Sequence, residues 1–239
     1  MAISADYITL QRHIADDLGD RQDLLSPLSD ESLTLSPIQN AIQSAIAKWE
    51  REPFYFNELY DTSFLTTVKG QEFYTSTDAP EIATLAYILR LHVLISSNRY
   101  PLSKRTWEYL EDTSVNPNVT GQPIDYAYFN AQIRLYPIPD GAYPITCSAT
   151  KRLSALSANS DSNAWTQDAY DLIRSEAKLI LAREVLHDDE LVSRMEAAIY
   201  GQSSVGGMFG RVADQRGYLY ALKAETTRRA RAKVVPSYF

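Results

Sequence analysis

The middle of this 239-residue chain has a different residue pattern from its two ends, and this change limits the folds open to it. From Pro53 to about Arg152, β-branched and aromatic residues gather in short runs separated by glycines and prolines, which is typical of strands joined by turns. On either side, apolar residues recur at steps of three and four, the period of an amphipathic helix. The pattern predicts an α+β protein in which a mostly antiparallel β module, residues 53–152, is inserted between helical segments.

Two helices are predicted in the N-terminal domain, residues 1–52. The first can end at Gly19, because glycine readily adopts the left-handed conformation that closes a helix. The second begins with "SPIQ", where Ser36 can be the N-cap and Gln39 its capping-box partner. The two helices are expected to pack as a pair through apolar stripes, which are Tyr7, Leu10, Ile14 and Leu18 in the first and Ile38, Ile42, Ala45 and Trp49 in the second.

One stretch of the β module is unusually regular. In "AQIRLYPIPDGAYPITCSATKRL", residues 131–153, two strand-like runs flank a turn sequence that contains Pro137, Pro139, Asp140 and Gly141. Prolines remove ladder hydrogen bonds from a strand, and Pro-Asp-Gly favours a tight turn. The stretch predicts a stiff β-hairpin whose first strand is an edge strand or is broken. A short helix is also expected in "SKRTWEYLED", with Ser103 as its N-cap.

The C-terminal third returns to the helical period. Trp165 to His187 can form one long helix, and "DDELVSRMEAAIY" can form another that Asp188 or Asp189 would cap. These helices, in residues 153–200, are predicted to complete a helical bundle with the N-terminal pair. Residues 201–239 add a Gly-rich joint, an extended C-terminal tail and, before the tail, a last helix suggested by Val212, Leu219 and Leu222.

Charge is unevenly distributed along the chain. Residues 223–233 carry a net charge of +4, although the whole chain carries −7, so the rest of the chain carries −11. Such a basic segment can contact nucleic-acid phosphates, dock on an acidic protein surface, or simply be a solvated helix end. The chain then ends in "KVVPSYF". Apolar residues after a charged segment favour a peptide that orders against another subunit.

The residues that usually carry catalysis or bind metals are sparse. The three histidines lie on separate predicted elements, and no phosphate-binding, zinc-protease or nucleophile-elbow motif occurs. "HDDE" at 187–190 could hold a divalent cation, but acidic residues at a helix start more often cap the helix. Cys147 lies in an alternating strand without an evident activating base, which favours a small core residue. We therefore expect no catalytic residue, no cofactor and no metal.

The same composition bears on where the protein is made. A single cysteine excludes an intrachain disulfide and is compatible with a reducing compartment. The start of the chain does not read as a signal peptide, and the longest apolar run, "TLAYILRLHVLIS", is too short for a membrane span. We expect neither a leader nor a membrane anchor.

The regular stretch carries a resemblance to a known family. "GQPIDYAYFNAQIRLYPIPDGAYPITCSATKRLSAL" resembles a region of the head-to-tail adaptor (connector) proteins of tailed bacteriophages, particularly short-tailed ones, in which "G-x-P-x-x-Y" leads into "L-R-L-Y-P-x-P-D" and "A-Y-x-I/L". The order of other features agrees over roughly residues 5–200. These features are "I-x-x-A-I" at Ile38 to Ile42, Phe54 and Tyr55 in a turn, a "V-x-G-Q-x-x-Y" hairpin at Val68 to Tyr74, and "A-Y-D-L-I" at Ala169 to Ile173.

The resemblance implies a structural virion protein at the head-tail junction, made in the host cytoplasm. Such adaptors form a ring, usually of twelve copies, that joins the portal protein to a downstream nozzle or tail-tube protein. The genome DNA would pass through the ring's lumen without specific binding. The helical part would surround this channel, and the β module would pack between neighbours or toward the tail.

Two sets of contact residues follow. C-terminal tails of similar proteins reach into the portal, which implies a portal-docking tail that includes Lys223, Arg228, Arg229, Arg231, Lys233, Val235, Tyr238 and Phe239. The stiff hairpin is the expected contact with a neighbouring subunit or a tail protein, through Tyr136, Pro137, Pro139, Asp140, Gly141 and Tyr143.

Three alternatives remain open at this point. The chain could be a different tail or connector component with the same order of helices and strands. It could be a tail-associated hydrolase, for which Asp188, Asp189 and Glu190 are the only crowded carboxylates. It could also be a DNA-binding module, although its overall acidity opposes this.

Overall fold

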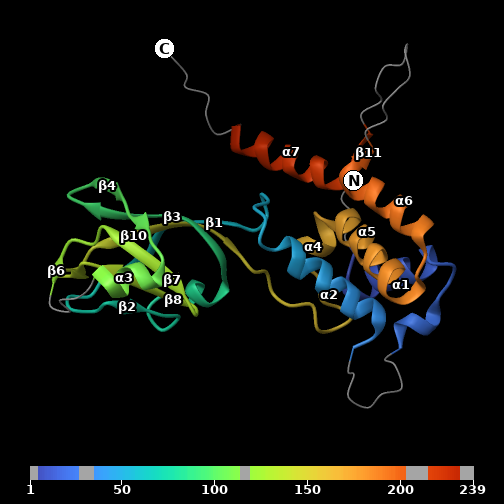
Figure 1. Ribbon diagram of the computed structural model, residues 1–239, viewed down its shortest axis with the longest axis horizontal. Helices are drawn as coiled ribbons and strands as arrows, with labels where there is room; N and C mark the ends of the chain where they lie inside the picture. The colour runs from blue at the N-terminus through green and yellow to red at the C-terminus, as the bar shows by residue number, and fades with distance from the viewer. Residues whose placement is uncertain (1–4, 27–34, 114–118, 203–214, 232–239) are drawn as a thin grey trace, which may run out of the picture. The chain divides into compact units, whose positions relative to one another are not determined.

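The computed structural model describes residues 5–26, 35–113, 119–202 and 215–231, and the chain divides into two compact units (Figure 1). The helical unit comprises residues up to Trp49, Phe54–Phe56 and the chain from Leu153 onward. The β unit comprises Glu50–Pro53 and Asn57–Arg152. Each unit has a hydrophobic core of its own. The predicted α+β class with antiparallel sheets is confirmed.

The first two helices of the helical unit begin and end where their capping residues stand. In α1 (Tyr7–Asp17), the Asp6 carboxylate accepts a hydrogen bond from the Thr9 amide at 3.0 Å. Gly19 follows the helix with φ +85°, a left-handed conformation that glycine adopts without strain. In α2 (Pro37–Trp49), the Ser36 amide donates to Gln39 Oε1 at 3.0 Å, and the Gln39 amide donates to Ser36 Oγ at 3.2 Å. The predicted capping box is confirmed.

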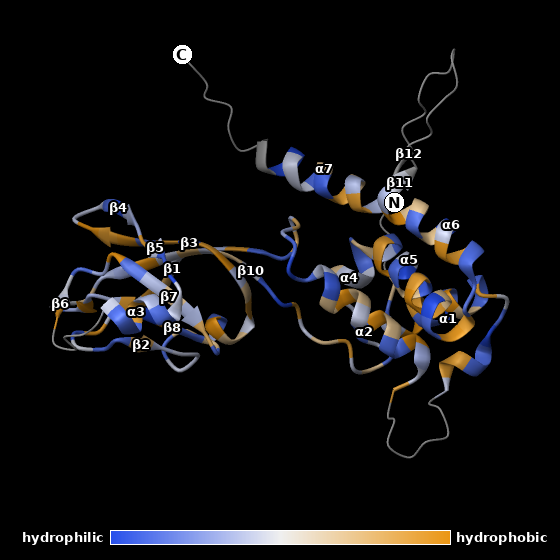
Figure 2. Cartoon of the chain, in the orientation of Figure 1, coloured by the Kyte–Doolittle hydropathy of each residue, from blue (hydrophilic) through white to orange (hydrophobic). Residues whose placement is uncertain are grey.

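Helix α2 packs most extensively against α5 (Tyr170–Leu181), and less against α1. Its apolar face supplies buried residues to one core together with α1 and α5; this core includes Leu10, Ile14, Ile38, Ile42, Trp165, Ile173 and Ile199. The colouring by hydropathy in Figure 2 shows apolar and polar residues on different parts of the same helices. The short 3₁₀ helix η1 (Gln22–Leu25) adds the buried Leu24.

The prediction of one unbroken helix from Trp165 to His187 is wrong. The chain forms α4 (Ala164–Gln167), α5, and a π-helical turn, η3 (Ala182–Leu186). It leaves helical geometry at Ala169, where φ is −107° and ψ is 20°. The adjacent Asp168 carboxylate accepts a hydrogen bond from the Tyr55 hydroxyl. A distant residue therefore holds the break, and the apolar periodicity continues across it, so the sequence carries no signal for it.

Helix α6 (Asp189–Tyr200) begins as predicted, because the Asp188 carboxylate accepts a hydrogen bond from the Leu191 amide at 2.9 Å. Two short strands, β11 (Gly201–Gln202) and β12 (Gln215–Arg216), pair before α7 (Tyr218–Arg231). A Cβ atom on Gly217 would lie 2.2 Å from the Ile199 carbonyl oxygen. Gly217 thus serves close backbone packing. Most of the predicted Gly-rich joint, and Val212, lie outside the described residues.

The β unit contains two four-stranded sheets that face one core. The first has the order β1-β10-β3-β4 and is antiparallel; its strands are β1 (Glu58–Thr66), β10 (Pro144–Lys151), β3 (Leu85–Ile95) and β4 (Asn98–Pro101). The second has the order β2-β8-β7-β5, with only β5 and β7 parallel; its strands are β2 (Phe73–Tyr74), β8 (Gln132–Tyr136), β7 (Asp125–Phe129) and β5 (Ser103–Lys104).

Shorter elements complete the β unit. They are the 3₁₀ helix η2 (Pro80–Thr84), α3 (Trp107–Thr113), and the parallel pair of β6 (Thr120–Gly121) with β9 (Ile138–Pro139). Ser103 does not cap α3 as predicted, since it lies in β5. The Thr106 hydroxyl oxygen instead accepts a hydrogen bond from the Tyr109 amide at 3.2 Å. None of the helices in the described ranges combines the length and the apolar character needed to cross a membrane.

The predicted hairpin at residues 131–153 is wrong. The strands are there, but β8 belongs to the second sheet and β10 to the first, so residues 137–143 cross between the sheets. The expected hairpin at Val68 to Tyr74 is a second crossing, from β1 to β2. Strands that are neighbours in sequence can bury their alternate side chains in one core from opposite sides. The alternating pattern predicts each strand without specifying its partner.

Candidate docking surfaces

Helix α7 has an inner and an outer face. On the inner face, Leu219 and Leu222 are partly buried against the core of the helical unit. On the outer face, Tyr220, Lys223, Thr227 and Arg228 lie exposed around one shallow depression. The basic residues of this helix therefore fall into two groups with different surroundings.

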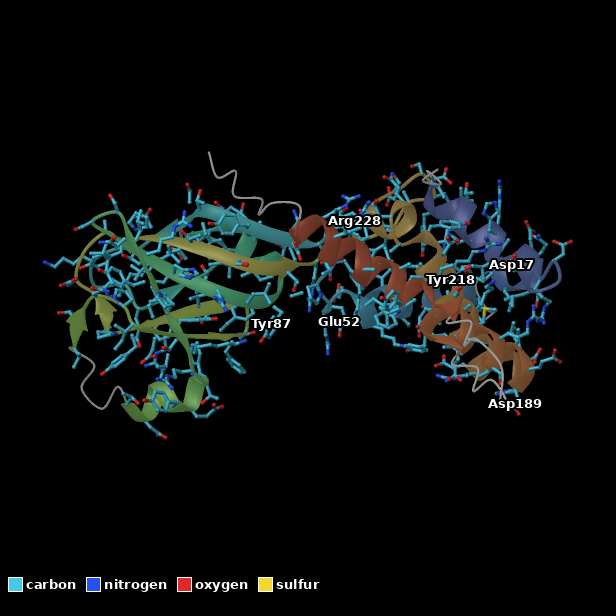
Figure 3. All side chains as sticks on the ribbon, turned by 90° about the horizontal axis from the view of Figure 1, so that it is seen from above. Asp17, Glu52, Tyr87, Asp189, Tyr218 and Arg228 are labelled. Atoms are coloured by element: carbon cyan, nitrogen blue, oxygen red, sulfur yellow. The ribbon has the colours of Figure 1, made fainter. Side chains whose placement is uncertain are left out.

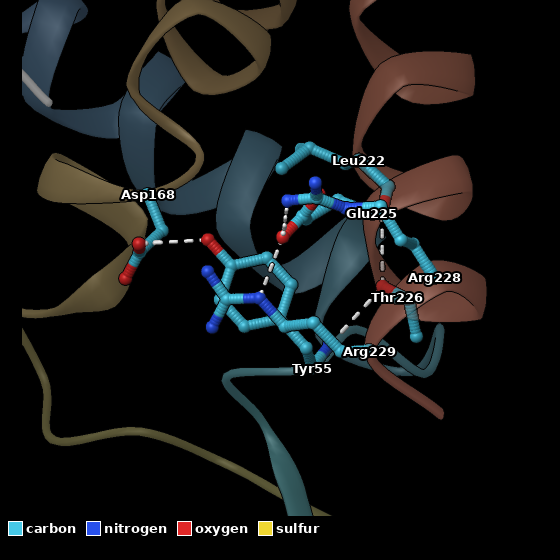
Figure 4. A network of polar contacts seen from close by, with 7 residues as sticks. All are labelled: Tyr55, Asp168, Leu222, Glu225, Thr226, Arg228 and Arg229. Atoms are coloured by element: carbon cyan, nitrogen blue, oxygen red, sulfur yellow. Dashed lines mark hydrogen bonds and ion pairs between the residues drawn. The ribbon is translucent and has the colours of Figure 1, made fainter. Parts of the chain in front are cut away.

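The inner face is fastened to the helical unit at Tyr55 (Figure 4). The Tyr55 amide donates a hydrogen bond to Thr226 Oγ1 at 3.2 Å, and the Tyr55 hydroxyl donates to Asp168 Oδ1 at 2.7 Å. The Arg229 guanidinium lies 3.7 Å from the centre of the Tyr55 ring, close enough for a cation–π interaction. One residue from a distant part of the sequence thus holds two successive turns of α7.

The charges around this attachment are fixed at neutral pH. Arg228 and Arg229 both donate hydrogen bonds to Glu225, which lowers the pKa of Glu225 to about 2. Burial, followed by the hydrogen bond to Asp168, raises the pKa of Tyr55 to about 12. Glu225 is therefore anionic and Tyr55 neutral near pH 7. Neither the Glu225 carboxyl nor the Tyr55 hydroxyl therefore titrates in the physiological range.

Packing beneath α7 is incomplete. A depression of about 440 Å³ lies between α7 and the break that joins α4 to α5, and Tyr55, Asp168, Tyr170 and Tyr218 are among its lining residues. Among the α7 side chains that the structure describes, from Tyr218 to Arg229, none is fully buried. Because α7 buries little apolar surface, the polar contacts at Tyr55 contribute much of the free energy that holds this helix on the helical unit.

Of the predicted portal-docking residues that the structure describes, only some lie on the same face of α7. Lys223 and Arg228 share the outer face, whereas Arg229 lies on the Tyr55 ring. The Arg231 side chain, Lys233, Val235, Tyr238 and Phe239 lie outside the described part of the chain. Sequence reasoning assigned no role at this surface to Tyr55 or Tyr220. Tyr220 lies three residues before Lys223 and could have been found from helical spacing, but Tyr55 acts through a contact that only the fold creates.

The crossing at 137–143 uses most of its polar groups internally. The Thr67 amide donates to the Tyr143 carbonyl at 2.9 Å, the Tyr143 amide donates to Thr67 Oγ1 at 2.8 Å, and the Gly70 amide donates to the Pro139 carbonyl at 2.8 Å. The Tyr143 hydroxyl donates to Asp140 at 2.6 Å. The two sheet crossings therefore hold each other. Of the predicted contact residues, Asp140 is exposed, Pro139 is buried, and Tyr136, Pro137, Gly141 and Tyr143 are half-buried.

Tyr74 fixes the other crossing from inside the core. Its side chain is fully buried, and its hydroxyl accepts a hydrogen bond from the Val68 amide at 3.1 Å and lies 3.0 Å from the Gln71 carbonyl, to which it donates. Burial raises the pKa of this hydroxyl, so it stays protonated. The "V-x-G-Q-x-x-Y" pattern is thus a turn tied to its own tyrosine.

The comparison with protein families decides what kind of protein this is. A family model described as "SU10 adaptor protein" matches residues 5–231. The chain belongs to the SU10 adaptor family. The resemblance to phage head-to-tail adaptors is confirmed, and the family is one of structural virion proteins rather than enzymes. A comparison with curated proteins found no match.

The patterned residues of this adaptor have structural explanations. Arg134, in the "L-R-L-Y" segment, is 4% exposed and forms ion pairs with Glu72 at 2.5 Å and Glu111 at 2.6 Å. Its guanidinium also lies 5.4 Å from the Phe73 ring and 5.5 Å from the Trp107 ring. Arg134 therefore fastens α3 to the second sheet. The segment that carries the family resemblance therefore forms the crossing between the two sheets and supplies the arginine that holds α3 on the second sheet.

The groups considered for catalysis in this adaptor have other partners or surroundings. Burial raises the pKa of the Cys147 thiol to about 12, so it is a poor nucleophile. His13 Nδ1 is hydrogen-bonded to the Tyr170 hydroxyl. Asp188 caps α6, while Asp189 and Glu190 are exposed in the first turn of that helix. Within the described ranges, no group of three His, Cys, Asp or Glu residues could hold a metal ion.

Proposed function

We propose that this adaptor forms a ring, of about twelve copies, that joins the portal to the downstream nozzle or tail-tube protein. The family match over residues 5–231 carries the proposal. In this proposal the helical unit forms a bundle around the DNA channel, and the β unit packs between neighbouring copies or toward the tail. The protein would be made in the host cytoplasm and would have no catalytic activity of its own.

The C-terminal segment from Lys223 to Phe239 is the proposed portal-docking element. The exposed positions of Lys223 and Arg228 on the outer face of α7 support this role. An acidic portal surface would attract them, and the apolar end of the chain would add buried area. Arg229 has a different proposed role, since it lies on the Tyr55 ring and holds α7 in place.

The acidity of the rest of the chain supports passage of the genome. With residues 223–233 set aside, the chain carries −11, and a lumen of that sign repels DNA phosphates. The proposal therefore includes DNA that moves through the ring without specific binding. The crossing at 137–143, and Asp140 in particular, is the proposed contact with a neighbouring subunit or tail protein.

The decisive experiment measures mass and docking together. Light scattering after size exclusion, with and without the portal of the same phage, should give an adaptor–portal complex with about one adaptor per portal subunit. Lys223→Glu with Arg228→Glu should weaken portal binding at least tenfold. Arg12→Glu with Arg194→Glu is the matched control, because both arginines are exposed on other helices of the same unit. Failure of the unmodified protein to bind the portal would refute the proposed function.

A further inference from the structure

The first sheet of the β unit has an outer face that carries exposed side chains. Helix α3 lies on the other sheet, where it contacts β7 and where its Glu111 pairs with Arg134 of β8. The inner face of the first sheet fills the core with residues such as Ile88, Leu91 and Cys147. The residues that alternate with these point outward. They and one lysine from β5 form a tyrosine–cation face, which consists of Tyr60, Tyr87, Arg90, Arg99 and Lys104.

Pairing across the sheet aligns this face. The register places Tyr60 of β1 opposite Ser148 of β10, and Ser148 opposite Arg90 of β3. Arg99 of β4 donates a hydrogen bond from Nη1 to the Tyr60 hydroxyl at 2.9 Å. Lys104 Nζ lies 4.1 Å from the centre of the Tyr87 ring; Tyr87 is labelled in Figure 3. The face is therefore built from side chains that restrain one another.

The two tyrosines of this face contribute little to the core. Tyr60 is 61% exposed and Tyr87 is 48% exposed, so about half or more of each side chain remains in contact with solvent. Tyrosine and arginine are the residue types enriched where proteins bind proteins, and restrained side chains lose little freedom on binding. The face carries three cations, Arg90, Arg99 and Lys104. One carboxylate, Glu58, lies in the row of paired residues across the sheet that also contains Tyr87. The face fits a partner with exposed carboxylates.

A second copy of the chain offers such a partner. Copies in a closed ring of more than two subunits meet through heterologous contacts, which require two different complementary surfaces on one chain. The chain outside residues 223–233 carries −11, and the helical unit exposes carboxylates such as Asp189 and Glu190. We infer that the tyrosine–cation face binds the acidic surface of the helical unit of a neighbouring copy. This inference rests on the proposed ring.

Duplex DNA is the other acidic macromolecule that the cations of this face could bind, through its phosphates. The observations favour protein, because repulsion from the acidic body opposes DNA binding and the charge of three cations is partly offset by Glu58. Binding of DNA is therefore one of the outcomes that the test must separate.

Zero-length cross-linking identifies the partner directly. Adaptor made with ¹⁴N and adaptor made with ¹⁵N are mixed, assembled on the portal, and treated with a carbodiimide, which joins an amine to a carboxylate in contact. We expect Lys104 to be joined to helical-unit carboxylates of the other isotope. Lys104→Arg keeps the charge but removes the reactive amine, so it should assemble normally and lose the cross-link. Cross-links from Lys104 only to the portal, or only within one isotope, would overturn the inference.

Charge reversal tests whether the face is needed. Arg90→Glu with Arg99→Glu should reduce the number of adaptors per portal at least several-fold in light scattering. Arg51→Glu, which reverses an exposed cation of the β unit outside this face and outside the two sheet crossings, should not. Circular dichroism melting establishes that both variants fold. A full ring formed by the Arg90→Glu, Arg99→Glu variant would overturn the inference. So would a variant that loses binding to duplex DNA but assembles as the unmodified protein does. If the unmodified protein binds the portal without forming a ring, the proposed function itself fails.

Discussion

At the scale of single residues, Tyr55 is the contact on which the position of α7 depends. Tyr55→Phe removes the hydrogen bond to Asp168 but keeps the ring under Arg229, whereas Tyr55→Ala removes both. A hydrogen bond of this kind contributes about 0.5–1.5 kcal/mol. We expect the amides of α7 to exchange roughly two- to tenfold faster with deuterium in the Phe variant, and faster again in the Ala variant.

Tyr109→Phe serves as the control for this measurement, since Tyr109 is an exposed tyrosine of the β unit. Its α7 amides should exchange at the unmodified rate. Equal protection of α7 in Tyr55→Ala and in the unmodified protein would show that the helix is held by other contacts.

Asp17 makes the stability of the helical unit depend on pH. Burial acts to raise its pKa, but hydrogen bonds from Arg174 and Lys178 outweigh burial and lower it below the ordinary 3.8. As pH falls, the unfolded chain therefore takes up a proton at this site before the folded chain does. The stabilisation from Asp17 is complete above about pH 3.8 and is lost as pH falls through the lowered value.

Asp17→Asn should consequently lower the free energy of unfolding at pH 7 by about 1 kcal/mol, a figure reduced for partial solvent exposure. Urea titrations at several pH values measure this difference. It should shrink in the most acid samples, where both proteins carry a neutral side chain. A difference that stays constant down to the lowest pH would exclude the ion pair as its cause.

At the scale of elements, the sequence predicts helices and strands better than it predicts their partners. The capping box of Ser36 and Gln39, the cap of Asp188 and the end of α1 at Gly19 are local, so short sequence patterns contain them. The break at Ala169 and the two crossings depend on residues that are distant in the sequence. For the docking surfaces, helical spacing groups Lys223 and Arg228, but the separation of Arg229 needs Tyr55.

The junction between α6 and α7 depends on the close approach at Gly217. Because a Cβ atom there would lie 2.2 Å from the Ile199 carbonyl oxygen, Gly217→Ala must displace backbone. We expect the start of α7 to lose protection from hydrogen exchange and the helical unit to become less stable. Gly141→Ala is the matched control, since its Cβ atom would meet nothing closer than 3.9 Å. Equal exchange in both variants would contradict this role.

At the scale of the whole molecule, the separate cores predict that the two units can be destabilised separately. Tyr74→Phe removes the hydroxyl that bonds to the Val68 amide and the Gln71 carbonyl, and each of these hydrogen bonds contributes about 0.5–1.5 kcal/mol to the β unit. Ile42→Val removes a buried methyl group from the helical unit and costs about 0.5–1.5 kcal/mol. In calorimetry, each change should lower the midpoint temperature of one unfolding transition by several degrees and leave the midpoint of the other transition unchanged. One transition that moves as a whole in both variants would contradict independent cores.

The insertion of the β unit between α2 and α5 also sets an order of events on the ribosome. Helix α2 packs most extensively on α5, and α5 begins about 120 residues after α2 ends. At roughly 5–20 residues per second, the N-terminal helices emerge about 6–24 seconds before their main partner exists. All strands of the two large sheets are complete by Lys151. The β unit can therefore fold first, while α1 and α2 still expose their apolar faces, and the nascent chain is most prone to aggregation in that interval.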